Sequence, residues 1–253
     1  MNTQVSASDT GRLVKRDLPP HFRLARGEHN TFEEGACATE AVAYLAGEEH
    51  SGRPQCASPV LTVFCFRLND LWKDDERQKL LSILPRLIGT RGDLGRHARQ
   101  AHAIVDGITR DLVPMILDPR GWTDLTTQLR SLAVIDDRES AQSACTTLSE
   151  VRKAISRRRK APPPTSASYD EFAAAYVDTA LITTYDSAIA WASNAAAYAY
   201  DAADIYAPDD TLAACAYDAV ACTAAYAACI AAYVFRHKVV AKTLDIFGRA
   251  IDA

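Results

Sequence analysis

Three cysteines in "CAYDAVACTAAYAAC", residues 215–229, recur among alanines and share this stretch with a single carboxylate. Cys215, Cys222 and Cys229 recur every seven residues, so on a helix they lie on one line that drifts by only about 20° per heptad. Successive thiols on this line are about 10 Å apart, too far for one metal ion or for a disulfide within the helix. The spacing therefore predicts close helix packing through small residues, and no metal site.

Asp218 is the only charged residue in the stretch 212–235, and it lies one turn from two of these cysteines. A carboxylate among alanine, cysteine and tyrosine side chains loses its hydration, which raises its pKa unless a cation or a hydrogen-bond donor is close. Three roles remain open. Asp218 can pair with a group of the preceding helices, it can act as an acid or base in a pocket with Tyr226 assisting, or it can be exposed to water.

Glu40 raises a similar question in "CATEAVAY", residues 37–44. On a helix it lies one turn from Cys37 and from Tyr44, beside an apolar stripe that faces the core. A glutamate in this position is expected to reach water or to pair with an arginine. Its alternative role is that of an acid or base in a pocket.

Two acids and two arginines form a second candidate cluster. Glu40 and Asp70 belong to separate predicted helices, and a Gly-Thr turn between two arginines can face them. Such a cluster can lock helices together, or it can hold a small polar molecule, because an arginine fork recognises carboxylates and phosphates. The candidate ligand-binding residues are therefore Asp70, Arg86, Arg91 and Tyr44, and the candidate catalytic residues, if the protein is an enzyme, are Asp218, Glu40 and Tyr226.

Motifs of higher chemical specificity are missing from the sequence. It contains no glycine-rich phosphate loop and no nucleophile elbow. Cys37, His50 and Cys56 can be imagined as zinc ligands, but they lack the closely spaced pair that is typical of zinc sites. We therefore expect neither a metal nor a cofactor.

The elements that position these residues are predicted to be helices, since helix starts and stops recur and the alternation typical of strands is almost missing. Thr31-Phe32-Glu33-Glu34 has the pattern of a capping box, and Asp136-Asp137-Arg138-Glu139 has it again. Ser58-Pro59 combines a capping serine with a proline in the first turn. The predicted helices cover about residues 31–46, ended by Gly47, then 58–72, 74–85 with a kink or an end near Pro85, 93–114, 124–132 and 136–160.

A linker rich in proline and serine, "APPPTSAS" at residues 161–168, divides the chain. Before it we expect a polar, flexible N-terminal arm over residues 1–29 and a mixed helical region over residues 30–160. Beyond it, residues 169–253 are expected to form a hairpin of two long alanine-rich helices that packs on the mixed region. The second of these helices has no polar stripe over residues 212–235, so both of its sides are expected to be covered. The predicted fold class is all-α.

The amino-acid composition and the net charge limit the classes of partner that the protein can have. The 253 residues are 48% hydrophobic and 24% charged, which is typical of a globular protein that buries a core. The formal net charge is −4, and the only dense basic run, residues 157–160, is expected to complement a helix dipole, so we expect no nucleic-acid partner. The stretch 212–235 is long enough to cross a bilayer, but Asp218 disfavours insertion, so we expect no membrane partner.

The number of cysteines and the N-terminal sequence together indicate the cellular compartment of the protein. Their number is odd, at seven, and the first thirty residues contain no apolar core of the kind found in a signal peptide. A reduced cytoplasmic setting is therefore expected.

The segments "GACATEAVAYLAGEEHSGRPQCASPVL", "LNDLWKDDER" and "LPRLIGTRG" resemble a family of uncharacterised bacterial and phage proteins. That family combines Gly-Ala-Cys-x-x-Glu-Ala-Val-Ala-Tyr-x-Ala-Gly-Glu with a later Pro-Arg-Leu-x-Gly-Thr-Arg, an alanine-rich tail and a short amphipathic end. Residues 29–92 carry the resemblance, "TLDIFGRAID" at 243–252 is similar to the usual ending, and Gly52 departs from an aspartate frequent in the family. The resemblance implies an architecture but no activity. The positions to which it draws attention are Cys37, Glu40, Tyr44, Cys56, Asn69, Asp70, Arg86 and Arg91.

These observations favour a soluble helical binding module whose ligand is a protein partner or a small polar molecule. The alternative is a metal-free enzyme of the lyase, cyclase or isomerase type, with a buried carboxylate as acid or base in a pocket between the two regions. A second alternative is a structural module that forms a homodimer through its alanine-rich helices.

Overall fold

The computed structural model describes residues 16–158 and 238–253, and within these ranges every regular element is helical. The predicted all-α class is therefore confirmed. Among the described residues, no helix combines the length and the apolar character needed to cross a bilayer. The elements in chain order are α1 (Ala38–Ala46), α2 (Pro59–Leu71), α3 (Asp74–Arg77), the 3-10 helix η1 (Gln78–Ser82), α4 (Leu84–Leu87), α5 (Leu94–Asp106), the π-helical segment η2 (Gly107–Leu112), α6 (Val113–Leu117), the 3-10 helix η3 (Asp118–Arg120), α7 (Thr123–Arg130), α8 (Arg138–Arg157) and a C-terminal helix over residues 238–252.

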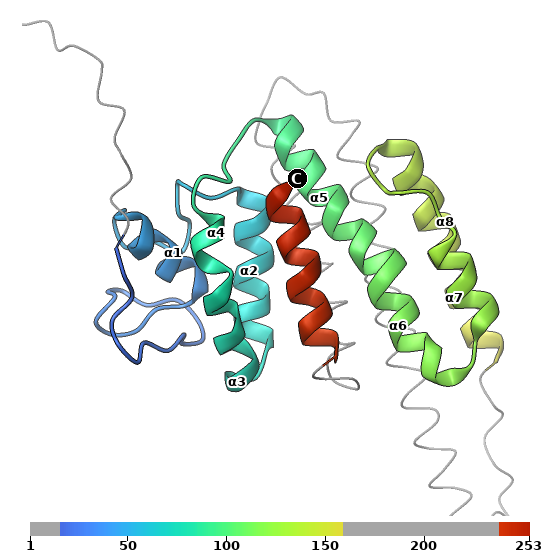
Figure 1. The fold of residues 1–253 in the computed structure, drawn as a ribbon, viewed down its shortest axis with the longest axis horizontal. Coiled ribbons are helices and arrows are strands. Elements are labelled where there is room, and N and C mark those ends of the chain that lie inside the picture. The colour runs from blue at the N-terminus through green and yellow to red at the C-terminus, as the bar shows by residue number, and fades with distance from the viewer. Residues whose placement is uncertain (1–15, 159–237) are drawn as a thin grey trace, which may run out of the picture.

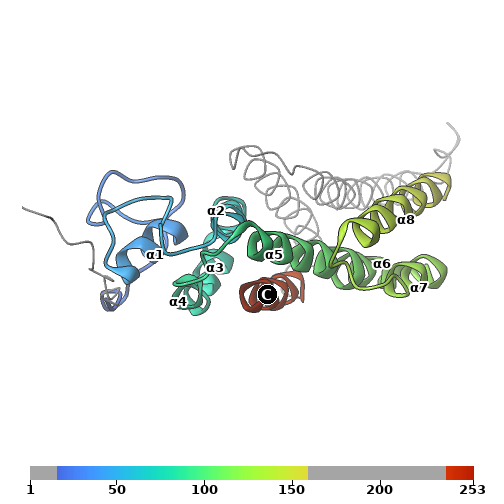
Figure 2. The same cartoon turned by 90° about the horizontal axis from the view of Figure 1, so that it is seen from above.

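The described helices lie in a row, with α1 at one end and α7 and α8 at the other (Figures 1 and 2). α1 packs on α2 and α4, α2 packs on α5, and α6 packs on α7, which in turn contacts α8. The C-terminal helix, red in Figure 1, runs beside α5 in both views. This layout gathers most of the predicted site residues at the end of the molecule that contains α1.

Side chains of the C-terminal helix complete the core. Phe247 is fully buried, and its ring meets the edge of the Phe64 ring of α2 with the centroids 5.2 Å apart. Ile246 lies so close to Gly107 that a Cβ at residue 107 would be 2.6 Å from its Cγ1. The described end of the predicted hairpin therefore packs on the N-terminal helices, while residues 161–168 and the remainder of the hairpin lie outside the described residues.

α2 begins where the sequence predicts. Ser58 is at the N-cap position and Pro59 is the first residue, as expected for a proline whose missing N–H has no helical partner to lose. The Ser58 hydroxyl, however, makes none of the capping hydrogen bonds that the sequence predicts. The helix buries Leu61, Phe64 and Leu68 completely. Because α2 contacts α1, α5 and the C-terminal helix, it supports the residues that lie across this end of the molecule.

The predicted helix over residues 93–114 is continuous from Leu94 to Leu117 but contains a π-helical segment. Asp93 caps it by accepting a hydrogen bond from Arg96 N. Pro114 has no N–H for the carbonyl four residues earlier, and its ring crowds that carbonyl in a regular α-helix. The wider turn of η2, immediately before α6, accommodates this proline and presents Gly107 to the C-terminal helix.

The start of α1 differs from the prediction. The capping box predicted at Thr31 gives only one turn, in which Glu34 N donates to Thr31 Oγ1 over 3.4 Å. Gly35 then adopts a φ of 142°, which ends the turn, and α1 begins at Ala38 with Cys37 as its N-cap. Gly47 ends the helix in the left-handed conformation, as predicted.

Two further boundaries differ in detail. The helix predicted from Asp74 is divided into α3, η1, which begins at Gln78, and α4, which follows Ile83. Pro85 lies in the first turn of α4. The cap of α8 is Asp137, which accepts a hydrogen bond from Ser140 N, one residue later than predicted. α8 ends at Arg157, the first residue of the basic run, a few residues before the predicted end near residue 160.

Candidate functional site

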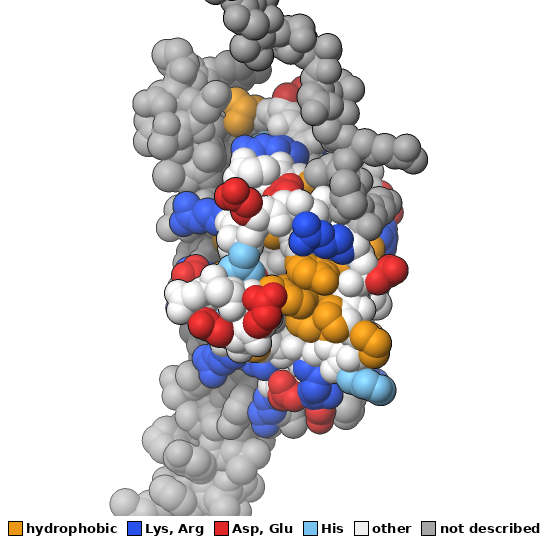
Figure 3. All heavy atoms as spheres, turned by 90° about the vertical axis from the view of Figure 1, so that its left-hand side faces the viewer, with side chains coloured by type: hydrophobic (Ala, Val, Ile, Leu, Met, Phe, Trp, Pro, Cys, Tyr) orange, Lys and Arg blue, Asp and Glu red, His pale blue; other side chains and the backbone are white. Residues whose placement is uncertain are grey.

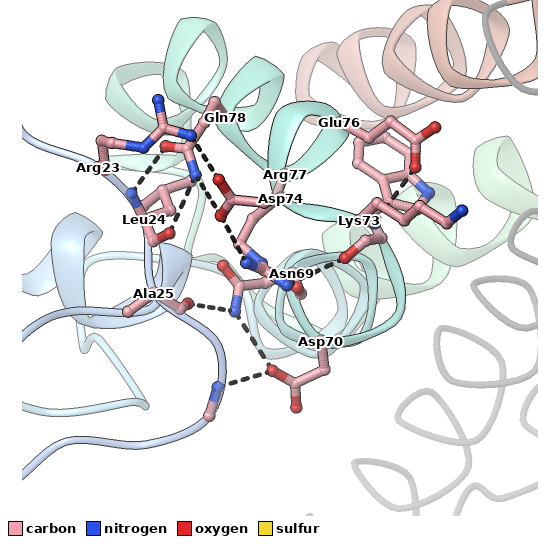
Figure 4. Close-up of polar contacts among 12 residues, drawn as sticks. Arg23, Leu24, Ala25, Asn69, Asp70, Lys73, Asp74, Glu76, Arg77 and Gln78 are labelled. Carbon is pink, nitrogen blue, oxygen red and sulfur yellow. Dashed lines mark hydrogen bonds and ion pairs between the residues drawn. The ribbon is translucent and has the colours of Figure 1, made fainter.

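An irregular segment, residues 23–29, is fastened to the helices by polar side chains (Figure 4), and we call it the strap. Gln78 of η1 accepts a hydrogen bond from Leu24 N over 2.8 Å and donates Nε2 to Leu24 O over 3.0 Å. Asn69 of α2 donates Nδ2 to Ala25 O over 3.0 Å. Leu24 is only 2% exposed and anchors the strap in the core. The part of the predicted arm that the structure describes is thus bound to the helices by its backbone.

Asp70 belongs to the same network. Its Oδ1 accepts hydrogen bonds from Gly27 N over 3.1 Å and from Asn69 Nδ2 over 3.3 Å. Figure 4 shows the Asp70 side chain directed at the strap from α2. This candidate ligand-binding residue is therefore used to satisfy the backbone of the strap.

Glu40 lies in the first turn of α1 and is 1% exposed. Its Oε1 accepts from His29 N over 2.8 Å, and its Oε2 accepts from Cys37 N over 2.7 Å. The His29 ring adds a third contact, with Nδ1 3.0 Å from Oε2. His50 approaches from the other side, where its Nε2 is 3.7 Å from Oε1 and 2.9 Å from His29 O. The carboxylate therefore joins the strap, the start of α1 and the loop after α1.

The ionisation of this cluster follows from its hydrogen bonds. Burial raises the pKa of Glu40, but the backbone N–H groups of His29 and Cys37 outweigh it and hold this pKa below its ordinary value. Burial raises the pKa of the Cys37 thiol to about 11, against the opposing hydrogen bond to Thr39. Glu40 is thus ionised at neutral pH and Cys37 is protonated, so neither is poised to take up a proton or to attack a substrate.

A stack of aromatic rings includes Tyr44, which lies one turn after Glu40 on α1. The Phe32 ring lies between Phe22 and Tyr44, with centroid distances of 5.2 and 3.8 Å and interplanar angles of 9° and 14°. The Arg16 guanidinium lies over Tyr44, 5.5 Å from its centroid. All three rings are partly exposed. We call these four residues the aromatic face. Figure 3 views the end of the molecule that contains α1, where hydrophobic side chains form a patch with basic side chains above and below it.

The two candidate arginines fasten other parts of the fold. Arg86 of α4 donates Nη2 to Oδ1 and Oδ2 of Asp252, over 2.9 and 3.0 Å, and to Gly248 O over 3.1 Å. Arg91 donates Nη1 to Oε1 of Gln55 over 2.8 Å. Arg86 thereby holds the C-terminal helix, and Arg91 holds the loop that precedes α2.

The predicted cluster of two acids and two arginines does not form, because each member has partners elsewhere. Histidines take the place of the arginine expected beside Glu40. Asp218 and Tyr226 lie outside the described residues, and so do Cys215, Cys222 and Cys229. Of the predicted ligand-binding residues, Tyr44 is the one that lies on the aromatic face. No group of three His, Cys, Asp or Glu residues within residues 16–158 and 238–253 is arranged to hold a metal ion.

The sequence did not point to the site residues that lie in the strap or beside it in the chain, above all Phe22, His29 and Phe32. They precede α1 in a segment without periodicity, so no helical or strand pattern pointed to them. One local signal was present. Cys37 followed by Glu40 has the spacing of a capping box, which predicts that the Glu40 carboxylate accepts a backbone N–H.

The fold and the site define an all-α protein with a stack of partly exposed aromatic rings and a buried carboxylate. Comparison of the chain with protein-family models, with curated proteins and with solved structures finds no match.

Proposed function

We propose that this protein is a helical binding module that recognises a partner protein through the aromatic face. The observation that carries the proposal is the stack of Phe22, Phe32 and Tyr44, partly exposed and flanked by Arg16. Aromatic and arginine side chains are enriched at protein interfaces, since they supply a large contact area with few rotatable bonds. A patch of this kind at one end of the molecule is typical of a docking surface.

The aromatic face is fixed before any partner binds. Phe22 precedes the strap and Phe32 follows it, while Tyr44 belongs to α1. Because Gln78, Asn69 and the carboxylates beneath hold the strap by its backbone, the rings keep their places without a partner. Preorganisation of this kind lowers the entropy that association costs.

The site supports binding better than catalysis. The Glu40 oxygens are occupied by backbone and histidine donors, and the Cys37 thiol stays protonated. A small polar ligand held by Glu40, Asp70, Arg86 and Arg91 would need these residues to converge, whereas each has separate partners. The partner we propose is therefore a protein.

We further propose that this binding takes place in the cytoplasm. Cys37, Cys56 and Cys65 are buried thiols that form no disulfide. Thiols that remain reduced are typical of a reducing compartment.

The proposal is tested by placing a photo-crosslinking phenylalanine analogue at Phe32 and, in a second protein, at the remote exposed residue Val134. In extract of the source cells we expect one protein to crosslink at Phe32 and not at Val134. With that protein purified, Phe22→Ser should weaken binding by about tenfold or more, as expected for a residue central to an interface. The matched control is Leu94→Ser on α5, also exposed, which should leave binding unchanged.

Equal crosslinking at the two positions would count against the aromatic face. So would a purified partner whose affinity is reduced as much by Leu94→Ser as by Phe22→Ser.

A further inference from the structure

The turn between α4 and α5 meets the N-terminal ends of two helices. Ser58 N, at the start of α2, donates to Thr90 Oγ1 of the turn over 2.9 Å, and Cys56 O accepts from Gly89 N over 2.9 Å. α5 begins four residues after Thr90. Both helices are 13 residues long, so the positive ends of two full helix dipoles border this turn.

Two arginines of this region are held by neutral acceptors. Arg91 donates to the side chain of Gln55, and Arg96 donates Nη1 to Gly89 O over 3.2 Å. Neither forms an ion pair with a carboxylate in the described part of the chain. Two acids lie near them: Asp93 accepts a hydrogen bond from Arg96 N as the cap of α5, and Glu48 accepts one from Gln55 N over 2.7 Å. A guanidinium has five N–H donors, so each arginine keeps donors for another acceptor while its position is fixed.

Two residues next to this turn, Ser58 and His97, each have a polar side-chain atom without a hydrogen-bond partner among the described residues. Ser58 is fully buried and its hydroxyl is unpartnered. His97 has a buried, unpartnered Nε2. Burial lowers the pKa of His97, and the charges of Arg91 and Arg96 lower it further against the opposing charge of Asp93. The charges of Arg91 and Arg96 therefore disfavour the protonated form of the His97 ring.

From this geometry we infer that the turn between α4 and α5 is a binding site for a small dianion, a phosphate ester or a dicarboxylate, held between Arg91 and Arg96. The two classes share the pair of oxygens that a guanidinium fork recognises. The site is separate from the aromatic face and takes a different class of ligand, so it does not depend on the proposed protein partner.

The test is calorimetric titration of the full chain with glycerol phosphate and, in a second arm, with succinate, at constant ionic strength near neutral pH. We expect at least one of them to bind at a single site. The double variant Arg91→Gln/Arg96→Gln should weaken this binding by about tenfold or more, because hydrogen bonds between charged groups are the stronger ones. The control Arg130→Gln removes an exposed arginine paired with Asp118 on a different helix and should bind as the parent does.

An independent readout keeps the test decisive if the double variant fails to fold. Titration of the His97 ring signals by NMR in the parent protein should give a higher pKa with the bound dianion than without it, because a negative charge nearby favours the protonated ring. The inference is overturned if neither compound binds, if the folded double variant binds as tightly as the parent, or if the bound dianion leaves the His97 titration unchanged.

Discussion

Glu40 stands out at the residue scale as a buried acid whose surroundings are built for its ionised form. Two backbone N–H groups and the His29 ring surround one carboxylate, and His50 lies beside it. Such an arrangement stabilises the fold by satisfying polar groups that burial would otherwise leave without partners. It also ties the strap, and with it the aromatic face, to the first turn of α1.

We expect Glu40→Gln to lower the free energy of unfolding by about 1–3 kcal/mol at neutral pH, because a charged acceptor of buried hydrogen bonds is lost. The pKa of Glu40 is lowered in the folded state, so its contribution is present above the pKa of the unfolded chain. It is lost as the pH falls through the folded value. Urea unfolding at about pH 7 and about pH 3 should therefore show a difference between variant and parent that shrinks in acid.

The control for this prediction is Glu34→Gln, an exposed glutamate that accepts a single N–H from Asn30 over 3.3 Å. It should change stability little at either pH. A Glu40→Gln variant as stable as the parent at neutral pH would show that the carboxylate does not hold the strap.

The sequence indicates which residues matter here better than it indicates their partners. Glu40 stands out as an acid beside an apolar stripe, but it is buried and paired with histidines, whereas the sequence predicts exposure to water or an arginine partner. Its contact with His29 spans eleven residues, and the pair of Arg86 with Asp252 spans 166. Pairings over such separations depend on the tertiary fold, for which helical periodicity carries no signal.

At the scale of elements, η2 and the C-terminal helix meet at Gly107. A Cβ there would lie 2.6 and 2.7 Å from two carbons of Ile246, which is fully buried and has no room to move. Glycine in a helix usually costs about 1 kcal/mol relative to alanine, so its use here reflects the close approach of a second helix.

Gly107→Ala is expected to destabilise the protein by about 1–3 kcal/mol, the usual result of overpacking a core, in spite of the better helix propensity of alanine. The measurement is chemical unfolding of Gly107→Ala, Ile246→Ala and the double variant, in which the two effects should be strongly non-additive. Gly248→Ala is the matched control, because a Cβ there meets only the flexible Arg86 guanidinium, and it should be nearly neutral. Additive effects in the cycle would contradict the close approach.

Helix boundaries could be predicted where the signal is local. Ser58 with Pro59, Asp93 and the aspartates before α8 lie at or within one residue of observed starts, because a cap and a first-turn proline act within a few residues. Thr31 misled the prediction for α1. Its turn forms, but Gly35 and the docking of the strap end it before a helix develops.

At the scale of the whole molecule, the C-terminal helix is held by a buried apolar face, in which Phe247 packs on Phe64, and by exposed ion pairs. We expect Phe247→Ala to cost about 3–5 kcal/mol, because it opens a cavity against Phe64. Arg86→Ala should cost less than about 1 kcal/mol, since water screens its pair with Asp252. Guanidinium unfolding of both variants measures the two costs, and an equal loss would mean that the ion pair, not the core, holds this helix.

The all-α class was predictable from the whole sequence, whereas the row of helices with the C-terminal helix beside α5 was not. Capping and periodicity are read within one element, but the order of elements in space is decided by which buried faces fit together. The predicted contact of the hairpin with the N-terminal helices is seen only for residues 238–253.

The place of Phe247 in the core has a consequence for how the protein is made. A chain growing on the ribosome exposes the Phe64 side of α2 until the helix over residues 238–252 has been synthesised and has emerged. Native contacts between residues so far apart in sequence form slowly and leave apolar surface open in the meantime. A nascent chain that lacks residues 238–252 should therefore depend on chaperones, and a chain terminated before Phe247 should be degraded or aggregate.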